Sequence, residues 1–293
     1  MTIRRPVISL LTDFGHMDPF VGMMKGVMLG INPDISIVDV THEIPPQDIS
    51  AGAHHLANAW RHFPGGTVHV AVVDPGVGSR RRALAVSAEG HYFVAPDNGL
   101  LTRVLHGASA WSAHAITESH YMAPAPSETF HGRDVFAPAA AHLSRGTFLE
   151  NFGPEVIDPV LAPEEFPRID GPTIRARVVH VDRFGNLVLN VDRGLLTGAA
   201  GGVEGGQSAT TPPAALEDSG SSEGPAAFAG LKISTEVGGR RIDRFVGHYA
   251  EAEGAPCFLI NSDDTLEIAI PGRSASAHLG LTRGSEVVLQ LAR

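Results

Sequence analysis

The chain has 293 residues, 43% hydrophobic and 18% charged, which is enough for one large or two ordinary globular domains. Its net charge of −10 disfavours a nucleic-acid partner, and its single cysteine, Cys257, excludes an internal disulfide or a multi-thiolate metal site. No apolar run approaches about 18 residues. We therefore expect no membrane span, no signal peptide and a cytoplasmic location.

The first half of the chain alternates short apolar runs with segments of helical spacing. Strands are expected at residues 6–12, 35–40 and 67–73, helices at 19–31 and 48–63, and then a hairpin within 83–95 and short helices at 100–105 and 135–143. Strand–helix–strand order at this spacing predicts an α/β domain over residues 1–165, with a doubly wound, mainly parallel sheet.

The second half has a different pattern. Residues 151–172 are rich in proline and acidic residues and predict an interdomain linker. Short alternating strands separated by turns follow, expected at residues 173–181, 187–191, 231–235, 257–260, 266–270 and 286–291. They predict an all-β, barrel-like domain over 173–293, interrupted at about 198–227 by a low-complexity insertion without chemistry.

The segment 73–82 (VDPGVGSRRR) carries the first candidate functional residues. Asp74 stands where the strand 67–73 should end, and proline and glycine then predict a tight loop that leads to three consecutive arginines. Ligands bind at the carboxyl ends of strands in open α/β sheets. We therefore expect other polar residues that follow predicted strands to converge on the same rim, namely Asp13, Asp18, His42, Asp97 and Asn98, together with His131 before a helix.

Three common chemistries lack their motifs. The first strand is not followed by G-x-G-x-x-G, so a dinucleotide site is not indicated. The fifteen histidines include no H-E-x-x-H pair, and no G-x-S-x-G elbow occurs. Chemistry on a positioned water, or binding alone, remains, with Asp, Arg and His as the working residues.

Seven motifs occur in order: 12–15 (TDFG), 38–42 (VDVTH), 73–78 (VDPGVG), 96–99 (PDNG), 130–134 (FHGRD), 184–186 (FGN), and 261–262 (NS) with 266–269 (LEIA). Together they resemble the S-adenosylmethionine (SAM) hydroxide adenosyltransferases, the adenosine-forming SAM hydrolases related to fluorinating and chlorinating enzymes. The resemblance covers nearly the whole chain outside the low-complexity insertion.

The resemblance implies an N-terminal α/β domain, a C-terminal β-barrel and a homotrimer with active sites between neighbouring subunits. It implies that water or hydroxide displaces methionine from C5′ of SAM, giving adenosine and L-methionine without a metal or cofactor. Two alternatives stay open at this point, a SAM-dependent halogenase and a non-catalytic SAM- or adenosine-binding protein.

By this resemblance Asp74, Arg81 and His131 match the family's water-binding set, with Arg80 and Arg82 as alternatives for the arginine. A carboxylate paired with arginine is a weak base, so we interpret Asp74 and Arg81 as groups that orient the water. The ordinary pKa of histidine lies near neutrality, which favours His131 as proton relay.

The resemblance also implies residues that bind SAM. Asp13 corresponds to the carboxylate that holds the ribose hydroxyls, since two acceptor oxygens suit a vicinal diol. The others are Asp18 and Asp182 near the methionine end, Ser262 at the methionine carboxylate, and Asn186, Phe184 and the backbone near Ala269 around adenine. The spacing around Asp182 is one residue shorter than in the halogenases.

Two positions separate this chain from the halogenating relatives. Gln47 stands where they carry a tryptophan, and they lack the carboxylate that Asp74 supplies, so hydroxide is favoured over halide. Structural roles are also expected nearby: Asp97 and Asn98 as turn formers and His42 as a packed residue behind the site, while Asp134 is either a carboxylate early in a helix or a ligand contact.

Overall fold

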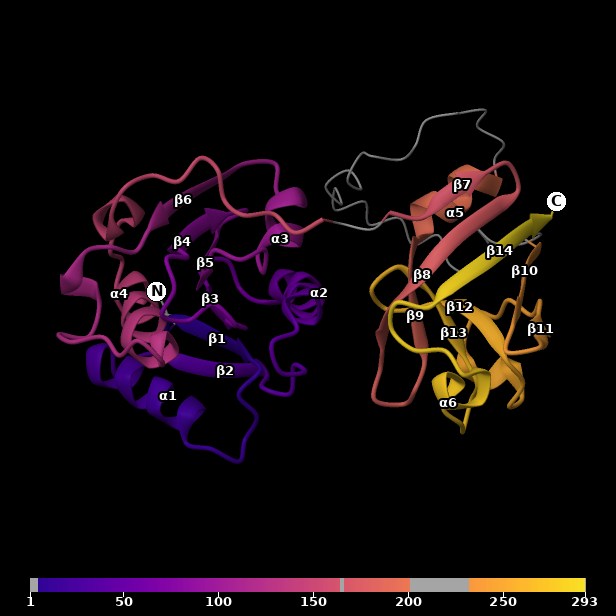
Figure 1. The fold of residues 1–293 in the computed structure, drawn as a ribbon, viewed down its shortest axis with the longest axis horizontal. Helices are drawn as coiled ribbons and strands as arrows, with labels where there is room; N and C mark the ends of the chain where they lie inside the picture. Colours follow the sequence, from indigo (N-terminus) through magenta and orange to yellow (C-terminus); the bar gives the residue numbers. More distant parts are fainter. Residues whose placement is uncertain (1–4, 164–165, 201–231, 293) are drawn as a thin grey trace. The chain divides into compact units, whose positions relative to one another are not determined.

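The computed structural model describes residues 5–163, 166–200 and 232–292. They form two compact units, the first running to Pro163 and the second comprising the described residues after it (Figure 1). Within these described ranges, no helix combines the length and apolarity needed to cross a membrane. Each unit has its own hydrophobic core and is described separately.

The first unit is built on a six-stranded mixed sheet with the order β2-β1-β3-β5-β4-β6. Its strands are β1 (Val7–Thr12), β2 (Ser36–Thr41), β3 (Val68–Val72), β4 (Ala83–Ala88), β5 (His91–Pro96) and β6 (Trp111–Ala115). The neighbours β2, β1, β3 and β5 run parallel, whereas β4 is antiparallel to both β5 and β6. The hairpin expected within 83–95 forms, and because it reverses β4, the sheet is mixed.

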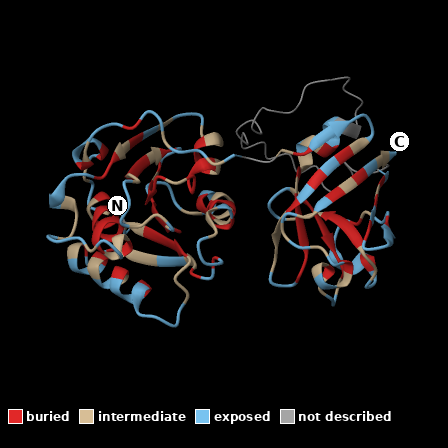
Figure 2. Cartoon of the chain, in the orientation of Figure 1, coloured by how far each residue is buried: buried red, intermediate tan, exposed pale blue. Residues whose placement is uncertain are grey.

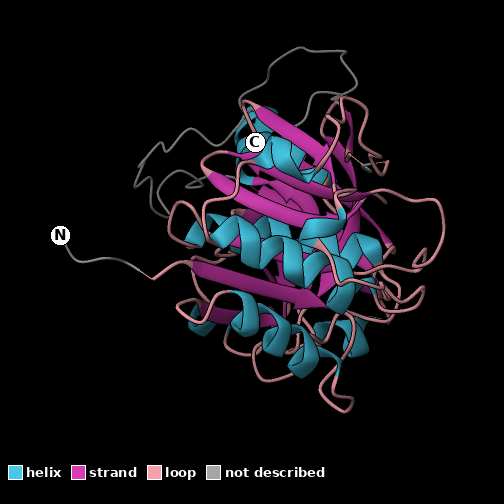
Figure 3. Ribbon diagram, turned by 90° about the vertical axis from the view of Figure 1, so that its left-hand side faces the viewer, coloured by secondary structure: helices cyan, strands magenta, loops and turns pink. Residues whose placement is uncertain are grey.

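Helices cover this sheet on both faces (Figure 3). They are α1 (Phe20–Ile31), α2 (Ile49–Ala59) with the turn Trp60–His62, α3 (Thr102–His106), the turn Ser119–Tyr121, the π-turn η3 (Gly132–Phe136), α4 (Ala137–Ser144) and the turn Leu149–Phe152. Leu10 and Leu11 of β1 point to opposite faces and enter different cores, one with α1 and α4, the other with α2 and α3. A strand buried on both faces is apolar throughout, which explains its unbroken hydrophobic sequence.

Residues 151–163 do not form the linker expected there. Val160 N donates to Asp97 Oδ1 at 2.7 Å, and Ala162 N donates to Thr102 Oγ1 at 2.8 Å. Val156 N also donates to the carbonyl of Ala113, so this proline-rich segment packs on the first unit. The composition was misleading because the backbone donors of the segment find buried acceptors elsewhere in the unit.

The second unit is an antiparallel, nearly closed, barrel-like sheet with the order β11-β10-β14-β8-β9-β13-β12, and β7 pairs with β8. Its strands are β7 (Arg168–Asp170), β8 (Thr173–Val181), β9 (Leu187–Asp192), β10 (Lys232–Val237), β11 (Arg240–Ile242), β12 (Cys257–Ile260), β13 (Thr265–Ala269) and β14 (Glu286–Ala292). A single bridge between Phe245 and Phe258 joins β12 to the segment after β11 and nearly closes the barrel. The all-β, barrel-like expectation is confirmed.

The core of this unit is formed by every second residue of its strands, as Ile174, Ala176 and Val178 of β8 illustrate (Figure 2). The sequence prediction missed β7, β11, the short turn Tyr249–Ala252 and the helices α5 (Arg193–Ala200) and α6 (Ala275–Leu279). Because α5 reaches Ala200, the first residues of the expected insertion at 198–227 are helical. The rest of that insertion lies outside the described residues.

Candidate active site

Four polar residues follow four neighbouring parallel strands of the first unit. They are Asp13 after β1, His42 after β2, Asp74 after β3 and Asp97 after β5. The strands are in parallel register, with the last residue of β1, Thr12, opposite the last residue of β3. The strand ends therefore bring these residues to one edge of the sheet, as the strand order predicted.

Arg81 joins Asp74 to His131. Its Nε donates to Asp74 Oδ1 at 2.9 Å, and one terminal nitrogen donates both to Asp74 Oδ2 and to His131 Nδ1, the latter at 2.8 Å. The Asp74 and Arg81 side chains are only 5% and 10% exposed. Such a two-pronged pair fixes the plane of the carboxylate as well as its position.

Neither of the neighbouring arginines, Arg80 and Arg82, pairs with Asp74. Arg80 is exposed, and the guanidinium of Arg82 is bound to Asp97 and Asp158. The register that places Arg81 opposite Asp74 is therefore the one that forms. The Arg81 guanidinium also lies 5.3 Å from the ring centre of Phe136, which shields it from solvent.

The contact with Arg81 determines the state of His131. A guanidinium can only donate, so Nδ1 accepts, and the neutral imidazole carries its proton on Nε2. Burial, and then the charge of Arg81, lower the pKa of His131 below its ordinary value. His131 is therefore suited to donate a hydrogen bond from Nε2.

The loop after Asp74 reaches His131 because glycine allows a close backbone approach. Gly78 has φ +76°, and a Cβ atom there would lie 2.4 Å from the carbonyl oxygen of Glu128. His131 itself caps the π-turn η3, and turns of this kind occur often at functional sites. Any side chain at position 78 would push the loop away from the histidine.

Asp13 is held by the backbone of a distant loop. Its Oδ2 accepts a hydrogen bond of 2.7 Å from the amide of Gln47, whose φ of +65° is strained for a non-glycine residue. The contact fixes one carboxylate oxygen, and Asp13 itself remains half-buried. Asp18, by contrast, is exposed in the segment before α1.

His42 is buried behind this edge. Its Nδ1 lies 2.8 Å from Thr12 Oγ1, and its Nε2 lies 3.1 Å from Asp39 Oδ1. Burial lowers its pKa, although Asp39 acts in the opposite direction. The side chain supports the end of β1, which agrees with the packed role expected from the sequence.

The Asp134 carboxylate accepts hydrogen bonds from the Arg133 side chain and from the backbone amide of Ser127.

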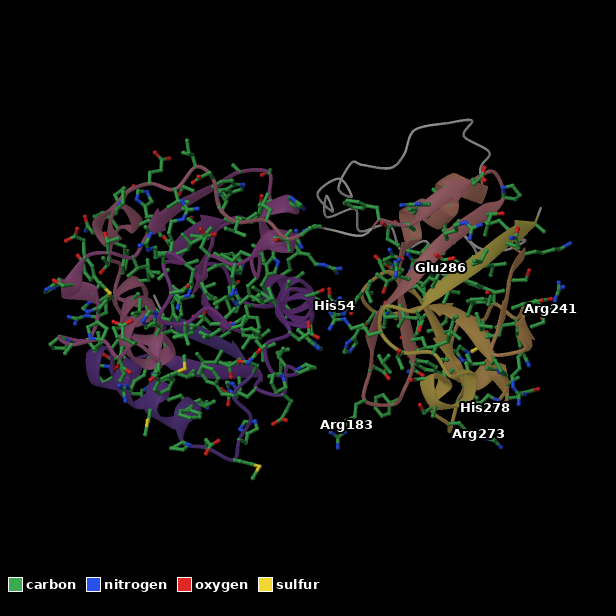
Figure 4. All side chains as sticks on the ribbon, in the orientation of Figure 1. His54, Arg183, Arg241, Arg273, His278 and Glu286 are labelled. Carbon is green, nitrogen blue, oxygen red and sulfur yellow. The ribbon has the colours of Figure 1, made fainter. Side chains whose placement is uncertain are left out.

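In the second unit, Asp182, Phe184 and Asn186 belong to one turn between β8 and β9. Asp182 Oδ1 accepts from the amides of Phe184 and Asn186 at 2.9 and 2.8 Å, and Oδ2 accepts from Asn186 Nδ2 at 2.9 Å. Phe184 is 78% exposed, and the neighbouring Arg183 projects from the same turn (Figure 4). Asp182 thus stabilises the turn.

The other two expected binding positions lie at opposite ends of β13. Ile268 pairs with Leu187, so the buried Ala269 lies beside Asn186. Ser262 is exposed in the turn before β13, roughly 13 Å or more along the strand direction. The structure therefore gathers Ala269 with the β8–β9 turn and places Ser262 apart from it.

Sequence reasoning missed Glu267, a charged residue within an apolar strand. It is 3% exposed, and its Oε1 accepts a hydrogen bond of 2.9 Å from Tyr249 Oη. Burial raises the pKa of Glu267, and Asp182 nearby raises it further. The sequence signal that could have identified Glu267 was a single acidic residue within a predicted strand.

Among the described residues, no three His, Cys, Asp or Glu side chains gather as a metal site requires.

Comparisons with known proteins match both units to one family. The profile of the SAM hydroxide adenosyltransferase N-terminal domain matches residues 8–153, and that of the C-terminal domain matches residues 220–288. An (R)-S-adenosyl-L-methionine hydrolase from Thermus thermophilus is 37% identical, over 97% of this chain and 99% of the relative. A fluorinase from Nocardia brasiliensis is 31% identical over 65% of this chain and 72% of its own. A crystal structure of an uncharacterized conserved protein from Thermotoga maritima matches with a TM-score of 0.82 and 30% identity, over 97% and 99% of the two chains.

Proposed function

The chain belongs to the SAM hydroxide adenosyltransferase family, and we propose that it hydrolyses SAM to adenosine and L-methionine. The observation that carries the proposal is the bridge of Arg81 between Asp74 and His131 at the ligand-binding edge of the sheet. Relatives that are named (R)-S-adenosyl-L-methionine hydrolases support the same reaction. Their name also indicates the (R) configuration at sulfur, which we include in the proposal.

The reaction needs positioning more than acid catalysis. The water oxygen forms a bond to C5′ while the electron pair of the C5′–S bond returns to sulfur, and the proton that the water loses is released to solvent. The sulfonium leaves as a neutral thioether, so no general acid is required for its departure. What the protein must supply is a water held in line with the C5′–S bond and support for its developing hydroxide character.

The charged residues of the first unit are suited to that task. Arg81 occupies one lone pair on each oxygen of Asp74, and the remaining lone pairs can accept hydrogen bonds from water. His131 Nε2–H can donate to the water oxygen. Asp13, fixed by Gln47, is placed to accept hydrogen bonds from the ribose hydroxyls. These roles divide the site into a part that serves water and a part that serves substrate.

In the proposed homotrimer, the second unit of a neighbouring subunit supplies the remaining substrate-binding residues. Asn186, Phe184 and the backbone at Ala269 bind adenine, while Asp182 maintains the turn. Asp18 and Ser262 serve the methionine end of the substrate. We also propose, as the sequence suggested, that the protein is a homotrimer located in the cytoplasm. The proposal further includes a doubly wound sheet and a reaction that needs neither metal nor cofactor.

A halide is a poor nucleophile for this arrangement. The carboxylate of Asp74 is nearly buried, and a negative charge next to the nucleophile position repels an anion while accepting hydrogen bonds from water. Fluorinases are nevertheless among the relatives, so the test includes halide.

The test is incubation of the purified protein with the separated (R) and (S) epimers of SAM, with and without chloride, followed by chromatography. We expect adenosine and methionine in equal amounts, faster from the (R) epimer, and no 5′-chloro-5′-deoxyadenosine. Incubation over many hours allows the products of a slow enzyme to be detected. Tight binding without any methionine release would replace the proposal by a binding function.

A further inference from the structure

The turn Pro96–Gly99 after β5 holds both ends of the loop that contains Asp74 and Arg81. We propose that Asn98, Asp97 and Arg82 are positioning residues, which select Arg81 as the partner of Asp74. This inference rests on the proposed function, because it concerns the residues that hold the attacking water. The three side chains touch the loop and act through it.

Asn98 anchors the start of the loop. Its Nδ2 donates to the carbonyl oxygen of Val73 at 2.9 Å, and its Oδ1 accepts from the amide of Leu100 at 3.2 Å. Val73 is the residue immediately before Asp74. Both the nitrogen and the oxygen of the Asn98 side chain are thus hydrogen-bonded, and the side chain fixes the peptide directly before Asp74.

Asp97 anchors the end of the loop. Its Oδ2 accepts from Arg82 Nε at 2.6 Å, its Oδ1 accepts from Val160 N at 2.7 Å, and its own amide donates to the carbonyl of Arg82 at 2.9 Å. Asp97 is 6% exposed, so these bonds form in a largely desolvated place. Arg82 is held further by the side chain and carbonyl of Asp158, both at 2.7 Å.

The three consecutive arginines make this anchor necessary. Arg80, Arg81 and Arg82 have the same side chain, and a loop with two glycines could shift to pair another of them with Asp74. Asp97 binds Arg82 from the side chain and from the backbone, which removes it as a competitor. The Arg82 side chain and carbonyl are both bound to Asp97, which fixes the backbone directly after Arg81 while the Arg81 guanidinium pairs with Asp74.

The variant Asp97→Asn removes the charge but keeps the size. We expect kcat for SAM hydrolysis to fall by about 10- to 100-fold, as for a misplaced catalytic group, while KM stays within about twofold. Asp158→Asn is the matched control: it also removes an ion pair to Arg82, but the Asp158 side chain is 78% exposed and Asp97 stays in place, so its kcat should stay within about twofold of the wild type.

A double-mutant cycle separates positioning from general stabilisation. In an Arg81→Ala background, Asp97→Asn should cost little further kcat, because the group that it positions is already absent. Equal fold-losses in both backgrounds, or a rise in KM with unchanged kcat, would overturn the inference. Asn98→Ala provides a second variant if Asp97→Asn fails to fold, with the same expected pattern.

Hydrogen exchange gives a readout that is independent of activity. Backbone amides within residues 74–82 should exchange faster in Asp97→Asn than in Asp158→Asn or the wild type. Unchanged exchange would count against the proposed positioning of this loop by Asp97. A wild type that releases no adenosine would refute the proposed function instead. The two failures are therefore distinguishable.

Discussion

The two units assemble their candidate binding residues in different ways. In the first unit, Asp74 and Arg81 share one loop and His131 comes from a distant segment, and charge-assisted hydrogen bonds join the three side chains. In the second, Asp182, Phe184 and Asn186 lie in a single turn that is closed by its own hydrogen bonds. The first arrangement depends on the whole sheet, whereas the second is fixed locally.

This difference indicates that the two units have different roles in the proposed function. A charge network that joins a loop after one strand to the start of a distant helical segment provides the rigidity that an in-line attack demands. A local turn with an exposed aromatic ring provides contact area for a ligand without reactive groups. Changes in the first unit should therefore alter turnover or specific polar binding, and changes in the second should alter affinity alone.

The largest effect is expected from Arg81→Ala. The variant removes the group that fixes Asp74 and contacts His131, so kcat should fall by about 100- to 1000-fold, with a small change in KM. His131→Ala should shift kcat in the same direction. The measurement is steady-state release of adenosine, with the exposed Arg80→Ala as control. Turnover like the wild type in Arg81→Ala would remove the proposed mechanism.

Asp13→Ala should weaken binding instead. Loss of charged hydrogen bonds to two hydroxyls corresponds to a rise in KM of about 10- to 100-fold, while kcat at saturation changes little. Initial rates over a wide range of SAM concentrations test this expectation. Asp34→Ala, an exposed carboxylate on the same unit, is the control. A fall in kcat with unchanged KM would place Asp13 in the chemistry rather than in binding.

His69 in the first unit and Glu267 in the second should contribute to stability with opposite dependences on pH. His69 is 1% exposed, and burial lowers its pKa from 6.5 to about 3, so only the unfolded chain gains a proton as the pH falls below 6.5. The free energy of unfolding of the first unit should then decrease by up to about 1.4 kcal/mol per pH unit between pH 6.5 and about 3. Burial raises the pKa of Glu267 above 4.5, so the second unit should lose stability as the pH rises from 4.5 through that raised value.

Thermal unfolding at a series of pH values measures both slopes. His69→Gln should flatten the acid-side slope, and Glu267→Gln should flatten the slope above pH 4.5. The exposed His62→Gln should change neither. If His69→Gln retained the full acid-side slope, the buried histidine would not be its cause.

The smallest effect is expected from Phe184→Ala. The ring is 78% exposed, so its removal should leave the unfolding temperature unchanged. If the ring stacks on adenine, the loss of about 1 kcal/mol corresponds to about a fivefold rise in KM. Phe148→Ala removes a ring of similar exposure, 74%, from the first unit and is the control. Equal KM values for the two variants would argue against stacking at Phe184.

Local features of the fold could be predicted from the sequence. Period-two strands such as Thr173–Val181, the βα alternation and the proline–glycine turn after Val73 all express short-range preferences. The convergence of Asp13, Asp74 and Asp97 also followed, because parallel strands place their carboxyl ends on one edge. The strand β6 was not predicted, so the position of β4 between β5 and β6 could not be predicted either.

Other features depended on tertiary contacts. Residues 151–163 looked like a linker because Asp97 and Thr102, which bind their amides, are distant in sequence. The state of His131 follows from the approach of Arg81, which spacing alone cannot reveal. The family motif favoured Arg81 among the three arginines, whereas the contact of Asp97 with Arg82, which accounts for that choice physically, could not be read from the sequence.

A crystal structure of the protein with a non-hydrolysable SAM analogue tests the central claim most directly. The account predicts a water in hydrogen-bonding contact with Asp74 and His131, about 3 to 3.5 Å from C5′ and opposite the sulfur position. An occupied site in which Asp74, Arg81 and His131 face away from C5′, with no water in line, would contradict it.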